Sequence, residues 1–137
     1  MNIAKLLTPK CDVVYINAED TIKAGMQKLR SCGYSSIPVI SKDGTYAGSV
    51  SEGDFLWYIT DSNGKDLSVS ALWDRPVSEA VNPGRNTPVS ITASAYEVAQ
   101  KALGQNFIPV IDDRGAFVGI VTRKTLIGYL LSHPADI

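Results

Sequence analysis

The chain has 137 residues, of which 45% are hydrophobic, and a formal net charge of −1. A chain of this length suits one compact unit or two interlocked half-domains, and the near-neutral charge provides no basic field for general nucleic-acid binding. No apolar run approaches the roughly 20 residues of a membrane span and the N-terminus lacks a signal-peptide core, so we expect a soluble cytoplasmic protein.

The first half of the chain predicts a helical turn, a strand, a helix, a hairpin and a second helix. The turn ends at Thr8–Pro9, because a residue before proline avoids the α region. A cap sequence at 18–21 precedes the first helix. The inner face of that helix carries Ile22, Gly25, Met26 and Leu29. The other expected ranges are 3–7 for the turn, 13–16 for the strand, 37–40 and 46–50 for the hairpin, and about 52 onward for the second helix.

The second half predicts the same order after a polar, turn-rich segment from Thr60 to Arg75. The expected ranges are 77–81 for the turn, 89–91 for the strand, 108–111 and 117–121 for the hairpin, and 123 onward for the last helix. Thr92 or Ser94 caps the middle helix, and we expect its core face to carry Tyr96, Ala99 and Leu103. The two final helices bear apolar faces, which are typical of packing between copies or between protomers. These faces carry Phe55, Leu56 and Ile59 in the first copy and Leu126, Ile127, Leu130 and Leu131 in the second.

An internal repeat explains this parallel order. Residues 37–54 and 108–125 share seven identities at a constant offset: one proline, four aliphatic residues and two glycines. A repeat of this kind decides the architecture of the whole chain. In each copy the hairpin ends at a hydroxyl residue, Ser51 or Thr122, in the position of a helix N-cap.

The two helix starts are candidate anion sites. Ser51 and Thr122 each place a hydroxyl and backbone N–H groups at the positive end of a helix, which favours phosphate. Asp54, one turn later, is suited to accept hydrogen bonds from both hydroxyls of a ribose. The alternative interpretation is that these residues only cap the helices.

The sequence gives no sign of catalysis. The single histidine, His133, lies next to a proline in the tail, and no Ser-His-Asp or Cys-His set can be assembled without it. Cys11 and Cys32 form neither a disulfide framework nor a metal set, and metal ligands at recognisable spacing are missing. We therefore expect no enzyme activity, no metal and no cofactor.

The pattern Gly-x-x-Ser/Thr-x-x-Asp, after a strand containing Pro-Val and a turn glycine, resembles the CBS domain. Residues 48–54 match it in full, and residues 119–125 match it except that Thr125 replaces the aspartate. Two copies resemble a CBS pair, or Bateman module. This resemblance implies an α/β fold of two β-α-β-β-α repeats related by a pseudo-twofold axis. The implied division is repeat 1 at 1–60, a linker at 61–76, repeat 2 at 77–132 and a tail at 133–137.

The resemblance also implies two ligand sites in clefts between the repeats, with the hydroxyl residue on phosphate or ribose, the aspartate on ribose and the segment before Pro-Val around adenine. The first site would use Thr8, Lys10, Val13, Ser36, Ile37, Pro38, Ser51 and Asp54. The second would use Asn82, Arg85, Phe107, Ile108, Pro109, Thr122 and Thr125. Because Thr125 offers no charged acceptor, we expect the second site to hold ribose more weakly or to take a different ligand.

Two adjacent cations at the second helix start, Arg123 and Lys124, oppose the helix dipole, and a bound anion would relieve that cost. Small stand-alone CBS pairs that bind cyclic di-AMP are similar here, and they also share the Gly33-Tyr34-x-x-Ile-Pro-Val segment. The leading expectation is a homodimeric regulatory sensor that binds AMP, ADP or ATP and signals to an unidentified effector protein. The alternatives are a cyclic di-AMP receptor, a module for an S-adenosylmethionine-type ligand, and a structural dimerisation module with empty clefts.

Overall fold

The computed structural model describes residues 3–63 and 69–133. The chain splits into two compact units, each with its own sheet and its own core. Unit 2 is Val14–Gly84, and unit 1 combines the residues up to Val13 with those from Arg85 onward. Both units follow the predicted β-α-β-β-α order, so the predicted α/β fold is confirmed.

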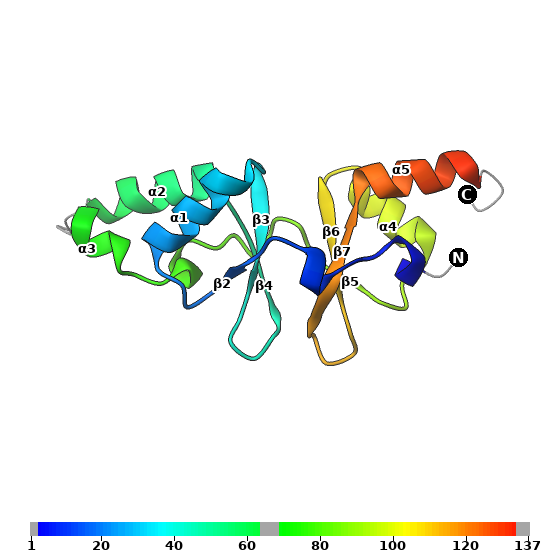
Figure 1. Cartoon of the computed structure of the whole chain (residues 1–137), viewed down its shortest axis with the longest axis horizontal. Helices are drawn as coiled ribbons and strands as arrows, with labels where there is room; N and C mark the ends of the chain where they lie inside the picture. Colours follow the sequence, from blue (N-terminus) through cyan, green and yellow to red (C-terminus); the bar gives the residue numbers. More distant parts are fainter. Residues whose placement is uncertain (1–2, 64–68, 134–137) are drawn as a thin grey trace. The chain divides into compact units, whose positions relative to one another are not determined.

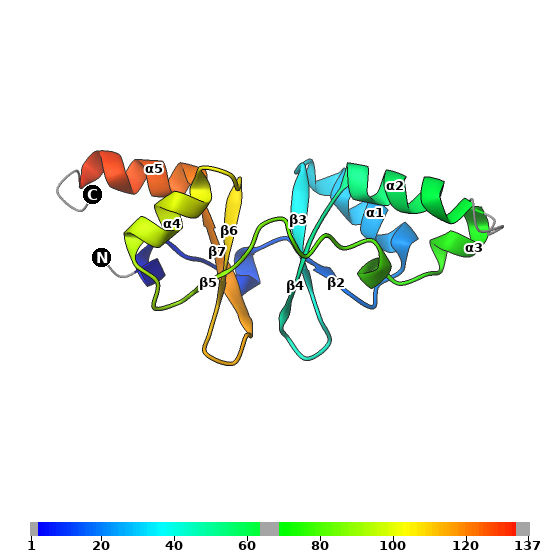
Figure 2. The same cartoon turned by 180° about the vertical axis from the view of Figure 1, so that it is seen from behind.

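Unit 2 consists of a three-stranded sheet and the helices that pack on it. Its elements are β2 (Ile16–Asn17), α1 (Ile22–Cys32), β3 (Ser36–Ile40), β4 (Tyr46–Ser51), α2 (Glu52–Asn63), α3 (Val69–Trp73) and the 3-10 helix η3 (Val77–Glu79). The strand order is β2-β3-β4, with β2 parallel and β4 antiparallel to β3. Helices α1 and α2 lie on the same side of the β3–β4 hairpin (Figures 1 and 2).

Unit 1 repeats this arrangement with one additional strand. Its elements are the 3-10 helix η1 (Ile3–Leu6), β1 (Thr8–Pro9), the 3-10 helix η2 (Lys10–Asp12), β5 (Val89–Ser90), α4 (Ala95–Ala102), β6 (Phe107–Ile111), β7 (Phe117–Thr122) and α5 (Arg123–Ser132). The strand order is β1-β7-β6-β5, with β5 parallel to β6 and both other pairs antiparallel. Helices α4 and α5 cover one side of the β6–β7 hairpin (Figure 2).

The helix faces that meet the sheets were predicted correctly in one repeat only. In α1, Ile22 and Leu29 are buried in the unit 2 core, as expected. In α4 the prediction is confirmed at Ala99, which packs against the unit 1 core, and is wrong at Tyr96 and Leu103, which are 70% and 86% exposed. Ser94 caps α4 by accepting a hydrogen bond from the backbone N–H of Glu97. The core contact of α4 is made by Val98, with Ala99 and Ala102 beside it.

The head of each repeat pairs with the hairpin of the other repeat. Thr8 lies opposite Ile120 in the antiparallel pair of β1 and β7. At the equivalent place in unit 2, Asn82 pairs with Ser49 of β4 through Asn82 N–H to Ser49 O at 2.9 Å and Ser49 N–H to Asn82 O at 3.3 Å. The folded units therefore cut across the sequence repeats, since each takes in the head segment of its neighbour.

This exchange explains why both repeats carry a glycine in the second hairpin strand. Gly48 has φ of +139°, and a Cβ there would lie 2.6 Å from Val81 Cγ1 and 2.9 Å from the Asn82 carbonyl oxygen. A Cβ on Gly119 would likewise collide with the Thr8 carbonyl oxygen. Only glycine lets the head segment come this close to the hairpin.

Several predicted boundaries differ from the structure. The strand predicted at 13–16 corresponds to β2, which is Ile16–Asn17. Strand β5 ends one residue earlier than predicted. Helix α2 continues to Asn63, three residues into the segment predicted as linker. Residues 64–68 of that linker and 134–137 of the tail lie outside the described residues. Within the described ranges, no helix is both long and apolar enough to cross a membrane.

Candidate functional site

The start of α2 is a reciprocal capping box. The Asp54 Oδ2 atom accepts hydrogen bonds from Ser51 N–H at 2.8 Å and from Ser51 Oγ at 3.1 Å. In return, Asp54 N–H donates to Ser51 Oγ at 3.3 Å. The predicted cap at Ser51 is confirmed, and its cause is local, because a hydroxyl and a carboxylate three residues apart satisfy two helix-start donors. The same bonds fix the orientation of the Asp54 carboxylate.

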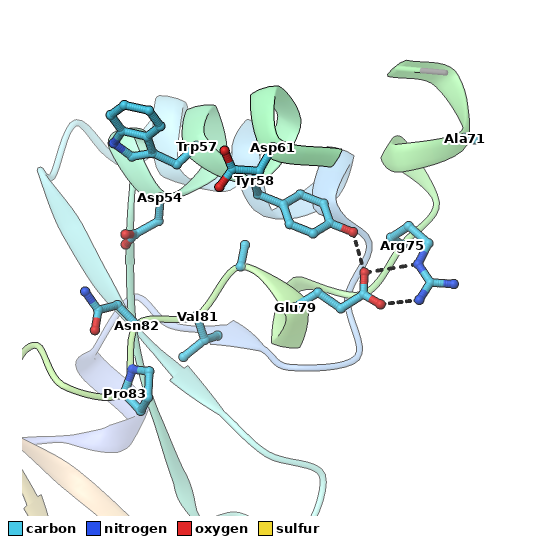
Figure 3. Close-up of a pocket in the computed structure, with 11 residues that line it drawn as sticks. Asp54, Trp57, Tyr58, Asp61, Ala71, Arg75, Glu79, Val81, Asn82 and Pro83 are labelled. Atoms are coloured by element: carbon cyan, nitrogen blue, oxygen red, sulfur yellow. Dashed lines mark hydrogen bonds and ion pairs between the residues drawn. The ribbon is translucent and has the colours of Figure 1, made fainter. Parts of the chain in front are cut away.

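Asp54 also lines a groove within unit 2, about 1050 Å³ in volume, which we call the α2 groove (Figure 3). One wall is the face of α2 that carries residues spaced by three and four. These are Asp54, Trp57, Tyr58 and Asp61. The other wall is the segment that follows α3 and contains the head of the second repeat. Its lining residues are Arg75, Glu79, Ala80, Val81, Asn82 and Pro83, with Ala71 at the end of the groove.

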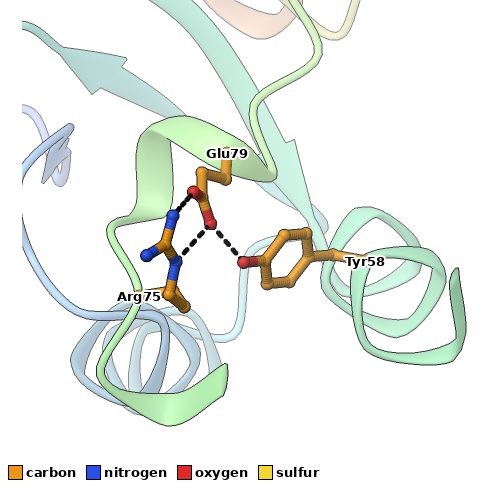
Figure 4. Close-up of polar contacts among 3 residues, drawn as sticks. All are labelled: Tyr58, Arg75 and Glu79. Atoms are coloured by element: carbon orange, nitrogen blue, oxygen red, sulfur yellow. Dashed lines mark hydrogen bonds and ion pairs between the residues drawn. The ribbon is translucent and has the colours of Figure 1, made fainter. Parts of the chain in front are cut away.

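A three-residue cluster joins the two walls (Figure 4). The Tyr58 phenol donates to Glu79 Oε2, and Arg75 binds both Glu79 oxygens, through Nε to Oε2 at 3.0 Å and through Nη2 to Oε1. The pKa of Tyr58 is raised above its ordinary value, mainly by burial and to a smaller extent by the hydrogen bond to Glu79. The bond to Glu79 likewise raises the pKa of Arg75. The cluster ties α2 to η3 and so sets the width of the groove.

The groove is acidic and has an exposed aromatic rim. Its lining contains three carboxylates, Asp54, Asp61 and Glu79, and one guanidinium, that of Arg75, which is paired with Glu79. Trp57 is 68% exposed on the α2 side. Such a lining suits an uncharged or cationic group with an aromatic face better than it suits a phosphate.

A second, smaller groove in unit 2 lies between α1, α2 and Trp73. It has a volume of about 610 Å³. Its floor is apolar, with Met26, Leu29 and Phe55. The rim carries Lys23, Gln27, Arg30 and Glu52. The two tryptophans therefore line different grooves of one unit.

The other first-site residues of unit 2 lie along β3. Ser36 and Ser51 are register partners in the β3–β4 pair, so the structure brings these two hydroxyl residues together. Ile37 is 1% exposed and packs in the unit 2 core, so its side chain serves packing. Pro38 is buried, whereas Tyr34 is exposed in the loop after α1.

The start of α5 in unit 1 is capped by hydroxyls alone. Thr122 Oγ1 accepts from Thr125 N–H at 3.2 Å and lies 3.0 Å from Thr125 Oγ1. The predicted cap is confirmed. No carboxylate takes part in this capping pair, which is the difference from Ser51 and Asp54 that the sequence predicted.

The structure provides a protein partner for Arg123 that the sequence did not indicate. Its Nε donates to the Ala102 carbonyl oxygen at 2.7 Å and its Nη2 to the Leu103 carbonyl oxygen at 3.5 Å. These carbonyls lie at the negative C-terminal end of α4, where a cation is favoured. These two carbonyl oxygens therefore stabilise the Arg123 guanidinium within unit 1, where the sequence suggested a bound anion. Lys124 is exposed at the same helix start.

The remaining candidates divide between the units in a way the sequence did not predict. Thr8, Lys10 and Val13 of the first set belong to unit 1, whereas Asn82 of the second set belongs to unit 2 and lines the α2 groove beside Asp54. The other members of the second set lie in unit 1. Phe107, Ile108 and Pro109 are buried in β6, and Arg85 is half-buried at the boundary of that unit.

Several residues that shape the α2 groove are not among the candidates predicted from the sequence. Trp57, Tyr58 and Asp61 follow Asp54 at helical spacing, which was a usable signal once Asp54 had been chosen. Glu79 carried no such signal, because its contact with Tyr58 spans 21 residues, and Arg75 joins the cluster through its pairing with Glu79.

A polar cluster in unit 1 was also missed. The buried Asn86, with φ of +54°, donates from Nδ2 to the Phe107 carbonyl oxygen at 2.9 Å. Beside it, Gln105 Oε1 accepts from Thr87 N–H at 3.1 Å and from Thr87 Oγ1 at 2.8 Å. These bonds anchor the 85–87 segment at the start of β6.

Comparison with known families gives one match. The family model of the CBS domain matches the chain twice, over residues 3–61 and 77–132. A comparison with curated proteins gives no match. The two matched stretches together include well over half of the chain.

Solved structures share the fold over nearly the full length. A CbpB protein crystallised in complex with cyclic di-AMP is 29% identical, with a TM-score of 0.88, and the match covers 99% of this chain and 88% of that one. CbpB from Streptococcus agalactiae is 31% identical, with a TM-score of 0.82 and coverages of 96% and 82%. CBSX2 in complex with AMP is 21% identical, with a TM-score of 0.76 and coverages of 97% and 98%.

Proposed function

The chain belongs to the CBS-domain family and carries the domain twice, and from this membership we propose that it is a regulatory module whose ligand is an adenine nucleotide. The observation that carries the proposal is the α2 groove, in which the carboxylate of Asp54 is held in place at a helix start within a motif typical of the family. An oriented carboxylate is a strong acceptor for the two hydroxyls of a ribose. Occupancy would be read by a partner protein.

Among adenine nucleotides we favour cyclic di-AMP over AMP, ADP or ATP. The support comes from the CbpB protein in complex with cyclic di-AMP, which is 29% identical over 99% of this chain. The acidic lining of the α2 groove agrees with a preference over ADP and ATP, because their additional phosphates would bring more negative charge near Asp54 and Asp61.

The residues proposed to bind the ligand are the candidates predicted from the sequence. The structure changes how much each of them is expected to contribute to binding. Ser51 and Asp54 serve ribose in the first repeat, and Thr122 with Lys124 serves phosphate in the second. Arg123 carries less weight than Lys124, because its guanidinium is already bound to two carbonyl oxygens of unit 1. Lys10 is a further cation for phosphate.

The output is proposed to be regulatory and not catalytic. We propose that the protein acts as a homodimer and that ligand occupancy changes its affinity for an effector protein. The exposed apolar residues Leu56, Ile127 and Leu131 on α2 and α5 support an interface on the helical faces. The cytoplasm is the proposed location.

A thermal-shift panel with AMP, ADP, ATP, cyclic di-AMP and S-adenosylmethionine tests the proposal on the full chain. A ligand at 100 times its Kd stabilises the native state by about 2.7 kcal/mol, which corresponds to a rise in Tm of roughly 10 °C for a chain of this size. We expect cyclic di-AMP to give the largest rise. A rise with S-adenosylmethionine alone would contradict a phosphate-bearing ligand, and no rise with any of the five would leave the structural dimerisation module.

Titration calorimetry on two variants then separates the nucleotide classes. Asp54→Asn removes the charge of the ribose acceptor while keeping an oxygen for the cap, and Lys124→Ala removes an exposed cation. For a mononucleotide, Asp54→Asn should lower affinity at least tenfold, because charge-assisted hydrogen bonds contribute roughly 1.5–3 kcal/mol each. For cyclic di-AMP, Lys124→Ala should lower the binding affinity more than Asp54→Asn does. If both variants bind every ligand with wild-type affinity, the assignment of Asp54 and Lys124 as ligand-binding residues is contradicted.

A further inference from the structure

The groove between α1, α2 and Trp73, which we call the α1 groove, has no part in the proposed function. It lies within unit 2 and has a volume of about 610 Å³, a size typical of sites for small molecules. Its α2 wall is formed by Glu52 and Phe55, whereas the α2 groove is lined by the face that carries Asp54 and Tyr58. The two grooves therefore lie on different faces of one helix.

The floor of the α1 groove is apolar and belongs to the unit 2 core. Leu29 and Phe55 are 2% and 1% exposed. Met26 and Trp73 are half-buried and pack against the same core. An apolar group that covered the exposed parts of Met26 and Trp73 would remove apolar surface from water, which is favourable. The floor therefore suits the apolar body of a ligand.

The charge of the α1 groove is opposite in sign to that of the α2 groove. Its charged lining residues are two cations, Lys23 and Arg30, and one carboxylate, Glu52. Lys23 and Arg30 are exposed, and none of the residues that the structure describes forms an ion pair with either of them. The α2 groove instead has three carboxylates and one paired guanidinium. An anion is therefore favoured in the α1 groove.

One end of the α1 groove combines a cation with the indole of Trp73. Lys23 lies in the first turn of α1, where the positive end of the helix also favours an anion. The Ile22 N–H donates to the Arg75 carbonyl oxygen at 2.8 Å, which ties the segment after Trp73 to this helix start. At this end the groove lining contains no carboxylate among the described residues.

The other end of the α1 groove has balanced charge. Arg30 lies in the last turn of α1. Glu52 opens α2 at the same end, because Ser51 before it is the register partner of Ser36, which begins the strand after α1. One cation and one carboxylate leave little net attraction for an anion here. The end with Lys23 is therefore the better place for a negative group.

We propose that the α1 groove is a second binding site, which takes a small amphiphilic organic anion. The negative group lies beside Lys23, and the apolar body covers Met26 and Trp73. The concave shape and the volume favour a small molecule over a protein partner, because stable protein interfaces are broad, about 800 Å² for each partner. The inference goes beyond the proposed function and does not depend on it, since no lining residue of the α1 groove is among the proposed adenine-binding residues.

Anilinonaphthalene sulfonate (ANS) is the probe, because it joins a sulfonate to an apolar aromatic body. Its uncharged analogue N-phenylnaphthylamine is the control ligand. The chain has two methionines, Met1 and Met26, so isotope labelling of methionine methyl groups gives two NMR signals, which Met26→Leu assigns. Saturating ANS should shift the Met26 signal. Titration calorimetry should show one ANS bound per chain, with higher affinity than the uncharged analogue.

Charge reversal on α1 provides the second readout. Lys23→Glu should weaken ANS binding roughly 3- to 30-fold, because a surface attraction becomes a repulsion, and should change binding of the uncharged analogue less than twofold. Arg30→Glu should have a smaller effect. Lys28→Glu is the matched control, since Lys28 is exposed on the same helix but does not line the groove. At about 0.15 M salt, which screens distant charges, Lys28→Glu should bind ANS within twofold of wild type.

Four results would overturn the inference. The first is a Met26 signal that does not move at saturating ANS. The second is an equal loss of ANS affinity in Lys23→Glu and Lys28→Glu, because the groove cation would then have no specific role. The third is ANS binding per chain that rises on dilution, because a second copy would then cover the groove. The fourth is retention of the protein on phosphatidylglycerol vesicles that Lys23→Glu abolishes, because the groove would then recognise a lipid surface.

The adenine site is tested separately with the same variant. Lys23→Glu should bind cyclic di-AMP with wild-type affinity, because Lys23 does not line the α2 groove. If the wild type binds ANS in the α1 groove but binds no adenine ligand, the proposed function is wrong and this inference stands. If it binds cyclic di-AMP while ANS leaves Met26 unchanged, the inference is wrong and the proposed function stands.

Discussion

Replacing Gly48 with alanine tests whether the head of the second repeat is held against β4 as the structure has it. Gly48 has φ of +139°, a conformation that alanine adopts only with strain. The new Cβ would also lie 2.9 Å from the Asn82 carbonyl oxygen and 2.6 Å from Val81 Cγ1. Val81 can rotate its side chain, but the carbonyl oxygen belongs to the backbone. The 81–83 segment must therefore move away from β4.

The expected loss of stability follows from these two terms. A residue in a disfavoured backbone region costs roughly 1–3 kcal/mol, and overpacking costs about the same again. Gly48→Ala should therefore lower the free energy of unfolding by roughly 2–6 kcal/mol. Because Asn82 would leave its place beside Asp54 in the α2 groove, affinity for the adenine ligand should fall as well.

Gly53→Ala is the matched control. Gly53 lies in the first turn of α2, and a Cβ there would meet only Ser51 Oγ, at 3.7 Å. Alanine in a helix is favoured over glycine by roughly 0.5–1 kcal/mol, so this variant should be more stable than wild type.

Urea denaturation followed by tryptophan fluorescence is the assay, because Trp57 and Trp73 both lie in unit 2. A free energy of unfolding for Gly48→Ala within about 0.5 kcal/mol of wild type, with Gly53→Ala behaving as expected, would refute the close approach of the 81–83 segment to β4.

Three further predictions concern titration, assembly and chemistry. The Tyr58 phenol should titrate above its ordinary pKa of about 10, because burial and the bond to Glu79 raise its pKa. The stabilisation linked to this raised pKa is therefore complete below about pH 10 and is lost as the pH rises through the raised pKa. Ultraviolet titration of the wild type against Tyr58→Phe measures this pKa. Light scattering should give a homodimer of twice 14.7 kDa at micromolar concentration, and a stable monomer would contradict the proposed interface. Pure protein should not hydrolyse ATP or cyclic di-AMP in a chromatographic assay, and sustained turnover abolished by Asp54→Asn would contradict the regulatory assignment.

The candidate site shows how far reasoning from sequence reached. The sequence predicts Ser51, Asp54 and Asn82 as ligand-binding residues, and all three lie in unit 2, with Asp54 and Asn82 in one groove. Their division into two separate ligand sets is what the resemblance to the CBS pair implies. Neither the resemblance nor the order of the chain indicated that Asn82 pairs with Ser49 of the first repeat.

The sequence by itself determined the elements whose causes are local. The repeated hairpins, the turn glycines and the caps at Ser51 and Thr122 each depend on residues within a few positions of one another. The repeat itself then implied that whatever one half forms, the other half forms too. These features were predicted correctly because no distant contact is needed to explain them.

Only the tertiary structure decided the features that join residues far apart in the chain. The face of α4 that enters the core, the partner of Arg123 and the cluster of Tyr58, Arg75 and Glu79 were all outside the reach of the sequence. In each case several arrangements satisfy the local rules equally well, since a helix periodicity allows adjacent faces and a cation accepts any nearby oxygen. The choice among them is made when the sheet and the helices pack together, because burial and hydrogen bonding must then be satisfied at once for the whole unit.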